Sequence, residues 1–241
     1  MAQTNLRKSV IIPQNLNSGE STRKSGINTE TDLLQKLGSK AFTKEELLQK
    51  VEKDFSLLPV VLKGTSSPKA TVRYGCAKVL MDVSEKYPEI LYPYFDDFIV
   101  LLKSKYRILT WNAIAIIANL TRVDRGRKFD VIFDQYYGFL NDEYMVTVAN
   151  VVGNSAKIAL AKPRLVQRIT SELLKVENIK LTPHLTVECK RVIIEHAIRS
   201  LDVFFEKIEA KEQVLSFVRK QLCSTRTSLR KEAQSFLEKR N

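Results

Sequence analysis

The feature of this 241-residue chain that most limits its fold is an apolar helical pattern that recurs about every 37 residues. One helical face is marked by Val72, Cys76, Val79, Leu80 and Val83. A shift of 37 residues brings Leu109, Ala113, Ile116, Ile117 and Leu120 onto the same positions. Self-similarity at a fixed period is typical of repeat proteins, in which each unit buries its apolar face against the next. The pattern therefore predicts an all-α chain of stacked helical repeats.

The same pattern continues toward the C-terminus. A further shift of 36 residues predicts an apolar face formed by Met145, Ala149, Val152, Gly153 and Ala156. Two later faces consist of Leu185, Cys189, Val192, Ile193 and Ala197, and of Leu229, Ala233, Phe236 and Leu237. First helices are thus expected to start near residues 68, 105, 142, 183 and 226. Second helices are expected at 88–103, 127–140, 163–176 and 211–222, each antiparallel to its predecessor because the connections are short.

The N-terminal part of the chain differs in composition. Residues 1–42 are rich in Ser, Thr, Asn, Gln and Gly, so we expect a flexible, mildly basic tail with a short helix near 32–37. Residues 43–241 form the expected repeat domain. Its first helix should begin at Thr43, which with Glu46 has the form of a capping box, and should continue to Gly64.

One segment resembles a known repeat family. Ser67-Pro68-Lys69-Ala70-Thr71-Val72-Arg73-Tyr74-Gly75-Cys76 is similar to the first helix of a HEAT repeat, whose usual form is Asp-Pro, three variable residues, Val-Arg, two variable residues and Ala. Leu229-Arg230-Lys231-Glu232-Ala233 matches the Val-Arg portion again, whereas Thr110 and Val146 stand where the middle repeats would have Arg. The resemblance implies a right-handed α-α superhelix, a short HEAT- or armadillo-like solenoid. It also implies a concave surface lined by the second helices that holds a protein or a nucleic acid.

The charge of the chain favours an acidic partner. Its 39 Lys and Arg exceed its 27 Asp and Glu, for a formal net charge of +12. Basic residues cluster where helices are joined, and matching positions of stacked repeats form a row along one edge. The candidate basic row comprises Lys103, Lys105, Arg107, Arg122, Arg125, Arg127, Lys128, Lys162, Arg164 and Arg168. Solvated polar turns are the competing interpretation of these residues.

Aromatic side chains in the second helices are candidate anchors for a partner. Tyr92, Tyr94 and Tyr137 could contact a peptide or stack on bases, although an aromatic stripe at helical spacing belongs to a core more often. Trp111, the only tryptophan, lies on a first helix, where packing between repeats is the favoured role.

Catalytic and metal-binding patterns were not found in the sequence. It has no Gly-rich phosphate loop, no His-Glu-x-x-His and no paired-cysteine motif, and His184 and His196 lack metal-ligand spacing. We therefore expect no cofactor, no metal and no enzymatic activity. The three cysteines, at positions 76, 189 and 223, are expected to be small apolar core residues of a reducing compartment.

Three functions remain open from the sequence. The favoured one is a non-catalytic scaffold or adaptor that binds an unidentified protein partner through its concave surface. The alternative is a solenoid that binds nucleic acid or another polyanion through the basic row. A HEAT-like DNA glycosylase that uses Trp111, Asp130 and Asp134 is least favoured. No apolar run suggests a membrane span or signal peptide, so we expect an intracellular, cytoplasmic protein, or a nuclear one in a eukaryote.

Overall fold

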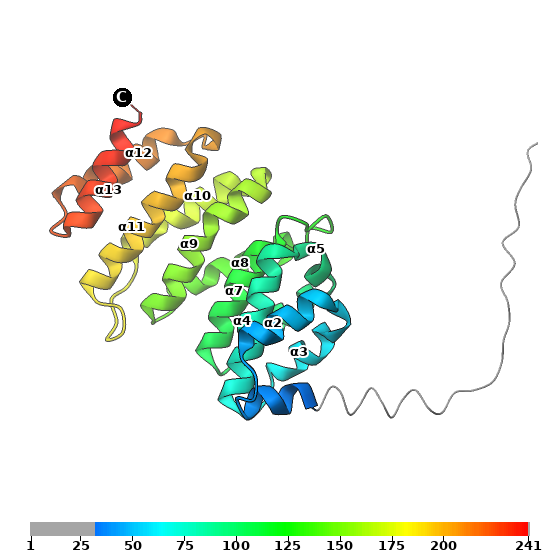
Figure 1. Ribbon diagram of the computed structural model, residues 1–241. Helices are drawn as coiled ribbons and strands as arrows, with labels where there is room; N and C mark the ends of the chain where they lie inside the picture. The colour runs from blue at the N-terminus through cyan, green and yellow to red at the C-terminus, as the bar shows by residue number, and fades with distance from the viewer. Residues whose placement is uncertain (1–31, 241) are drawn as a thin grey trace, which may run out of the picture.

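The computed structural model describes residues 32–240, and these form two layers of helices stacked side by side (Figure 1). No strand occurs within this range. The first layer contains the longer helices, which all run in the same direction. They are α4 (Ala70–Lys86), α7 (Arg107–Leu120), α9 (Met145–Ala161), α11 (Val187–Phe204) and α13 (Thr227–Glu238). Their starts confirm the predicted starts of the five first helices to within about four residues.

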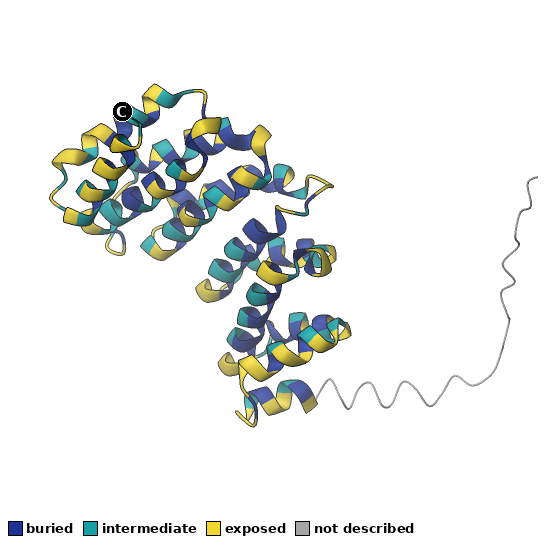
Figure 2. Ribbon diagram, turned by 45° about the horizontal axis from the view of Figure 1, so that its top comes forward, coloured by how far each residue is buried: buried dark blue, intermediate teal, exposed yellow. Residues whose placement is uncertain are grey.

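The second layer returns the chain between consecutive long helices. Its α-helices are α2 (Lys44–Lys53), α3 (Leu58–Gly64), α5 (Pro88–Leu91), α6 (Phe95–Leu102), α8 (Lys128–Gly138), α10 (Val166–Leu174) and α12 (Lys211–Arg219). Short 3-10 turns extend or join them: η1 (Phe55–Leu57), η2 (Tyr92–Tyr94), η3 (Phe139–Asn141), η4 (Pro163–Leu165), η5 (Lys175–Asn178), η6 (Phe205–Lys207) and η7 (Lys220–Cys223). The four predicted second helices are confirmed, and buried residues run between the two layers (Figure 2).

The helix expected from Thr43 to Gly64 is broken in the structure. Its start is confirmed, because Thr43 accepts a hydrogen bond from the Glu46 amide while the Glu46 carboxylate accepts one from the Thr43 amide. Asp54, however, adopts an extended conformation and its Oδ1 accepts from the Ser56 amide at 3.0 Å. Asp competes in this way with helical backbone bonding, so the chain turns and restarts as η1 and α3.

The packed domain begins earlier than the boundary expected at residue 43. Residues 32–38 are helical, as predicted for this stretch, and Leu37 and Phe42 are buried in the same core as the repeats. Leu37 lies over Gly75 of α4, where a Cβ would approach its Cδ2 to 3.2 Å. The absence of a side chain at Gly75 therefore leaves room for Leu37 of the N-terminal helix to pack against α4. Residues 1–31 lie outside the described part of the chain.

The buried face of α9 differs from the predicted one. Buried residues of α7 and α9 correspond at a shift of 38, as in Leu109 with Thr147 and Ala113 with Val151. The predicted shift of 36 instead selected Gly153, which is exposed, and Met145, Ala149 and Ala156, which are half-buried. Polar residues lie on both faces of α9, because Thr147 and Ser155 are buried while Asn150 and Asn154 are half-buried, so the apolar pattern does not distinguish the two alignments. The faces predicted for α4 and α7 are confirmed.

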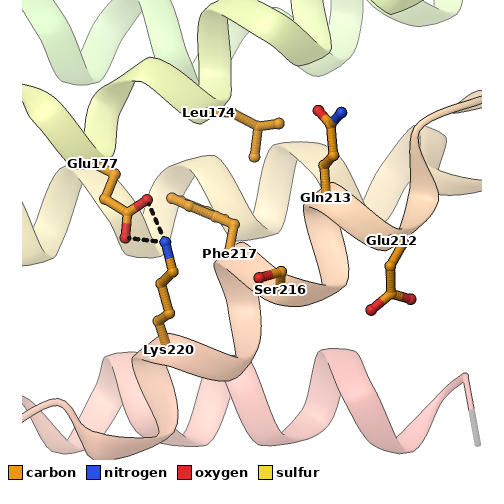
Figure 3. A pocket seen from close by; sticks show the side chains of 7 residues that line it. All are labelled: Leu174, Glu177, Glu212, Gln213, Ser216, Phe217 and Lys220. Carbon is orange, nitrogen blue, oxygen red and sulfur yellow. Dashed lines mark hydrogen bonds and ion pairs between the residues drawn. The ribbon is translucent and has the colours of Figure 1, made fainter.

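The long helices line the inner side of the stack. Consecutive long helices pack directly on each other throughout, whereas packing between consecutive second-layer segments is sparse. Clefts separate the second-layer segments at two places, between α3 and α6 and between α10 and α12. In the second cleft, Phe217 faces Leu174 and Lys220 bridges to Glu177 at 3.0 Å (Figure 3). Because the layer nearer the centre of curvature is the more closely spaced one, the concave side belongs to the long helices. The resemblance had assigned it to the second helices.

Candidate binding surfaces

The structure distributes the predicted basic row over two opposite edges. The parallel long helices put all their N-termini at one edge and all their C-termini at the other (Figure 1). Lys103, Lys105 and Arg107 lie where α7 begins, whereas Arg122 and Lys162 follow the ends of α7 and α9. A helix of this length separates the two edges by roughly 20 Å at about 1.5 Å per residue. The ten residues therefore do not form one continuous row.

Half of the predicted basic residues are neutralised by acidic residues, mostly of the neighbouring repeat. The five pairs join atoms of Arg107 with Asp142, Lys128 with Asp96, Lys162 with Asp124, Arg164 with Asp130, and Arg168 with Asp134. Partners lie 32 to 38 residues apart in sequence. These side chains thus connect one repeat to the next. Within residues 32–240, no acidic residue pairs with the others, namely Lys103, Lys105, Arg122, Arg125 and Arg127.

Lys162 belongs to a buried cluster around Asp124. The exposed fractions of the two residues are 4% and 3%, and Lys162 Nζ lies 3.0 Å from Asp124 Oδ2. Asp124 Oδ1 accepts from the Tyr92 hydroxyl at 2.6 Å and from the Lys128 amide at 2.8 Å, and Oδ2 accepts from the Phe129 amide at 3.1 Å. The carboxylate therefore caps α8 and joins three repeats. Lys162 is a structural residue and is not available to a partner.

Ionisation of this cluster follows from its hydrogen bonds. Burial alone would raise the pKa of the Asp124 carboxyl, but the bonds from Tyr92, Lys162 and the two amides outweigh it and lower that pKa. Burial and the bond to the Asp124 carboxylate raise the pKa of Tyr92 to about 12. At neutral pH Asp124 is therefore a carboxylate and Tyr92 a neutral phenol.

The predicted aromatic anchors are mainly structural. Tyr137 is 2% exposed, and its hydroxyl donates to Ser155 of α9 at 3.1 Å. Its neighbour Tyr136 is also buried, with its hydroxyl donating to the Ile114 carbonyl of α7 at 3.2 Å. Adjacent tyrosines are both covered because α8 is enclosed on two sides. Tyr92 serves the Asp124 cluster, and only half-buried Tyr94 lines an open cleft, the one between α3 and α6.

Packing between repeats is confirmed as a role of Trp111, whose indole N–H donates to Thr147 Oγ1 of α9 at 3.0 Å. Asp130 and Asp134, the acids of the glycosylase alternative, are paired with arginines of the next repeat. Because these two acids and Trp111 are all occupied by contacts between repeats, they do not form a pocket that could hold an alkylated base.

The remaining residues singled out in the sequence are dispersed. His184 stacks on Tyr144 at 4.3 Å, and burial lowers the pKa of half-buried His196. Cys76 is buried, which raises the pKa of its thiol to about 12, but Cys223 is exposed, contrary to the expectation of a core cysteine. No cluster of His, Cys, Asp or Glu suited to a metal ion is found in the described part of the chain. Among residues 32–240, no helix is long and apolar enough to cross a membrane.

The open face of the inner layer is uncharged over its centre. On α7 it presents Trp111, Asn112 and Ala115, and on α9 it presents Val146, Ala149, Asn150, Gly153 and Asn154. The side-chain amides of Asn150 and Asn154 donate to carbonyls of their own helix at 2.8 Å, so their Oδ1 atoms point away as acceptors. Gly153 is exposed in the middle of α9, and nothing lies within 4 Å of where its Cβ would be.

A cavity of about 390 Å³ lies at the C-terminal end of this face. It is lined by Glu85, Asn119, Arg122, Lys157, Leu160 and Ala161, from the ends of α4, α7 and α9. Buried Asn119 donates to Ser84 Oγ and accepts from Lys157 Nζ, each at 2.9 Å. These hydrogen bonds link three consecutive long helices. They could not be predicted from the sequence, because no local pattern relates residues that lie 35 to 38 positions apart.

Comparison with known proteins identifies the architecture. No family model matches the sequence, and no curated protein matches it. One solved structure, described as a computationally designed armadillo repeat protein for modular peptide recognition, shares 18% sequence identity with this chain. The match has a TM-score of 0.57 and covers 91% of this chain and 94% of that one. A designed armadillo repeat protein in complex with the peptide (KR)4 is 16% identical with a TM-score of 0.53, over 92% and 96%. The described chain is therefore an all-α solenoid with the fold of armadillo- and HEAT-like repeat proteins.

Proposed function

We propose that this protein is a scaffold that binds an extended segment of a partner protein across the inner face of α7 and α9. The observation that carries the proposal is Gly153. Glycine in a helix interior costs about 0.5–1 kcal/mol relative to alanine. Nothing in the fold requires it here, because a Cβ would contact no other side chain. A glycine that weakens its helix without serving the packing is explained by a partner backbone that approaches α9 closely.

The surrounding side chains suit such a segment. Asn112, Asn150 and Asn154 offer amide groups to a backbone, and Trp111 and Val146 offer apolar contact. The structural neighbours, of which one is described as made for peptide recognition and another is in complex with a peptide, support a peptide partner by analogy of fold. Nucleic acid is the less supported alternative, because half of the predicted basic row is paired and the row is split between two edges.

The test compares two exposed glycines. Gly153→Gln fills the inner face, and the matched control Gly138→Gln makes the same change on the second layer, where nothing lies within 4 Å of a Cβ either. Peptides are selected from a random display library on the wild-type protein and then measured by fluorescence anisotropy with both variants. We expect Gly153→Gln to weaken binding at least tenfold, about 1.4 kcal/mol, and Gly138→Gln to leave it unchanged.

Two results would overturn the proposal. One is that no peptide is enriched; the other is that both variants bind the selected peptides as the wild type does. Thermal unfolding serves as the folding control, since replacement of Gly153 in the helix interior should raise stability by about 0.5–1 kcal/mol. A loss of binding by a more stable protein cannot be attributed to unfolding.

A further inference from the structure

The turn between α7 and α8 carries the densest unneutralised charge among the described residues. Arg122, Arg125 and Arg127 lie within six residues, are all exposed, and have no acidic partner in residues 32–240. Arg122 does bond to the protein, but to the main-chain carbonyls of Glu85 and Asn119, which leaves its positive charge uncompensated. Three like charges in so short a turn repel each other. Arg122 offsets this cost through its two carbonyl bonds, whereas the side chains of Arg125 and Arg127 make no hydrogen bond or ion pair with residues 32–240 and do not stabilise the fold.

The turn is held rigidly beneath these arginines. Buried Asp124 fixes it to α8 through the Lys128 and Phe129 amides and to the next repeat through Lys162. Arg127 has a φ of 55°, in the left-handed region that Gly or Asn adopts at lower cost. The chain thus keeps an arginine where stability favours another residue, and positions it on a fixed support.

The inner-face cavity adjoins this charge. Arg122 belongs to both features, since it lines the cavity together with Lys157 and Leu160. Leu160 is 48% exposed and gives the cavity an apolar wall. Lys157 adds a second cation, and Glu85, whose carboxylate lies 3.9 Å from it, is the one acid in the lining. The combined surface is cationic with an apolar recess.

We infer that this surface recognises an acidic segment of a protein partner, with Asp or Glu side chains on the three arginines and an adjacent apolar side chain in the cavity. The inference rests on the proposed function and specifies the partner. Guanidinium groups bind carboxylates through paired, charge-assisted hydrogen bonds. A short acidic segment fits better than a nucleic acid because the cavity beside the arginines has an apolar wall at Leu160, which suits an apolar side chain of a peptide and offers nothing to a phosphate backbone.

The experiment uses the whole chain and a labelled dodecapeptide in which Asp and Glu alternate with Leu. The neutral control peptide has Asn and Gln in place of the acids. The test variant combines Arg125→Gln with Arg127→Gly, and glycine suits the backbone at that position. The matched control combines Lys103→Gln with Lys105→Gln, which removes the same charge from the opposite edge. We expect the test variant to bind the acidic peptide at least tenfold more weakly, about 1.4 kcal/mol, and the control variant to bind within about twofold.

Several outcomes would overturn the inference, and one of them would leave the proposed function intact. The inference is wrong if the wild type prefers the neutral peptide, if neither peptide binds, or if both variants lose affinity equally. It is also wrong if duplex DNA displaces the acidic peptide and the arginine variant weakens binding of the DNA more than binding of the peptide. Library-selected peptides that require Gly153 but are indifferent to the arginine variant would overturn this inference alone and leave the proposed function intact.

Discussion

Two ion pairs of nearly equal sequence separation illustrate how differently basic residues act in this solenoid. Lys162 pairs with Asp124, 38 residues earlier, and Arg168 pairs with Asp134, 34 residues earlier. The side chains of the first pair are 5% and 0% exposed, and those of the second pair are 52% and 88% exposed. Both pairs connect the same two repeats. Burial, which the spacing does not reveal, separates a structural charge from a solvated one.

The difference arises from what surrounds each carboxylate. Asp124 is bonded by a phenol, two amides and an ammonium group, so its desolvation is offset by fixed donors. Asp134 is paired with one guanidinium, which also lies 4.0 Å from the Phe133 ring, and otherwise faces water. The buried cluster therefore fixes the turn that presents Arg125 and Arg127, whereas the exposed pair contributes little to the geometry of a binding surface.

The largest effect is expected from Asp124→Ala. Removal of one partner of a buried ion pair leaves the Lys162 ammonium uncompensated and typically costs about 3–5 kcal/mol. The matched change Asp134→Ala should cost about 0–1 kcal/mol, because the pair is exposed. Urea unfolding followed by circular dichroism measures both. Equal losses would show that the cluster does not stabilise the fold as its geometry indicates.

An intermediate effect on the free energy of unfolding is expected from Tyr92→Phe. The change removes a hydrogen bond to a carboxylate, and such a bond contributes about 1.5–3 kcal/mol. Because the pKa of Tyr92 is raised from 10.0 to about 12, the folded protein keeps a proton between these pH values that the unfolded chain loses. Stability should therefore fall as the pH rises through this window, and less steeply in the variant. Buried Tyr136 and Tyr137 contribute the remaining slope in both proteins.

Tyr94→Phe is the control for this change, since the Tyr94 hydroxyl makes no hydrogen bond with residues 32–240. It should leave the stability at neutral pH as in the wild type. A variant at Tyr92 with an unaltered slope would mean that this phenol does not donate to Asp124 in solution.

The repeat architecture was predictable because it depends on local, periodic signals. Apolar stripes marked α4, α7 and α13 correctly, and Thr43 with Glu46 marked the start of α2. The register of α9 was not predictable, because its buried face includes Thr147 and Ser155 while its open face carries Ala149 and Gly153, so polarity does not separate the two faces. The break at Asp54 was missed since the apolar spacing continues through it. Leu37 and Gly75 form a contact between distant residues that only tertiary structure brings together.

The candidate site was predictable in composition but not in arrangement. The sequence correctly indicated that Arg122, Arg125 and Arg127 share a turn, and Asp124 was visible only as their one opposing charge. Its burial depends on Lys162 and Tyr92, each from another repeat. The side of the stack that is concave depends on how closely whole helices pack. Neither property is encoded within the span of one helix, so neither is accessible to an argument from local patterns.

The smallest effect on the free energy of unfolding is expected from Arg168→Gln. The salt dependence of this effect distinguishes the exposed ion pair from the buried one. An exposed ion pair contributes about 0.2–1 kcal/mol, and salt screens exposed charges within a Debye length of about 8 Å at physiological ionic strength. The destabilisation caused by Arg168→Gln should therefore shrink toward zero as sodium chloride is raised. The matched change Lys162→Gln should cost several times more and keep its cost in salt, because the ions do not reach a buried pair. If both costs fell in parallel with salt, Lys162 would be hydrated in solution, and it would return to the set of cations available to an acidic partner.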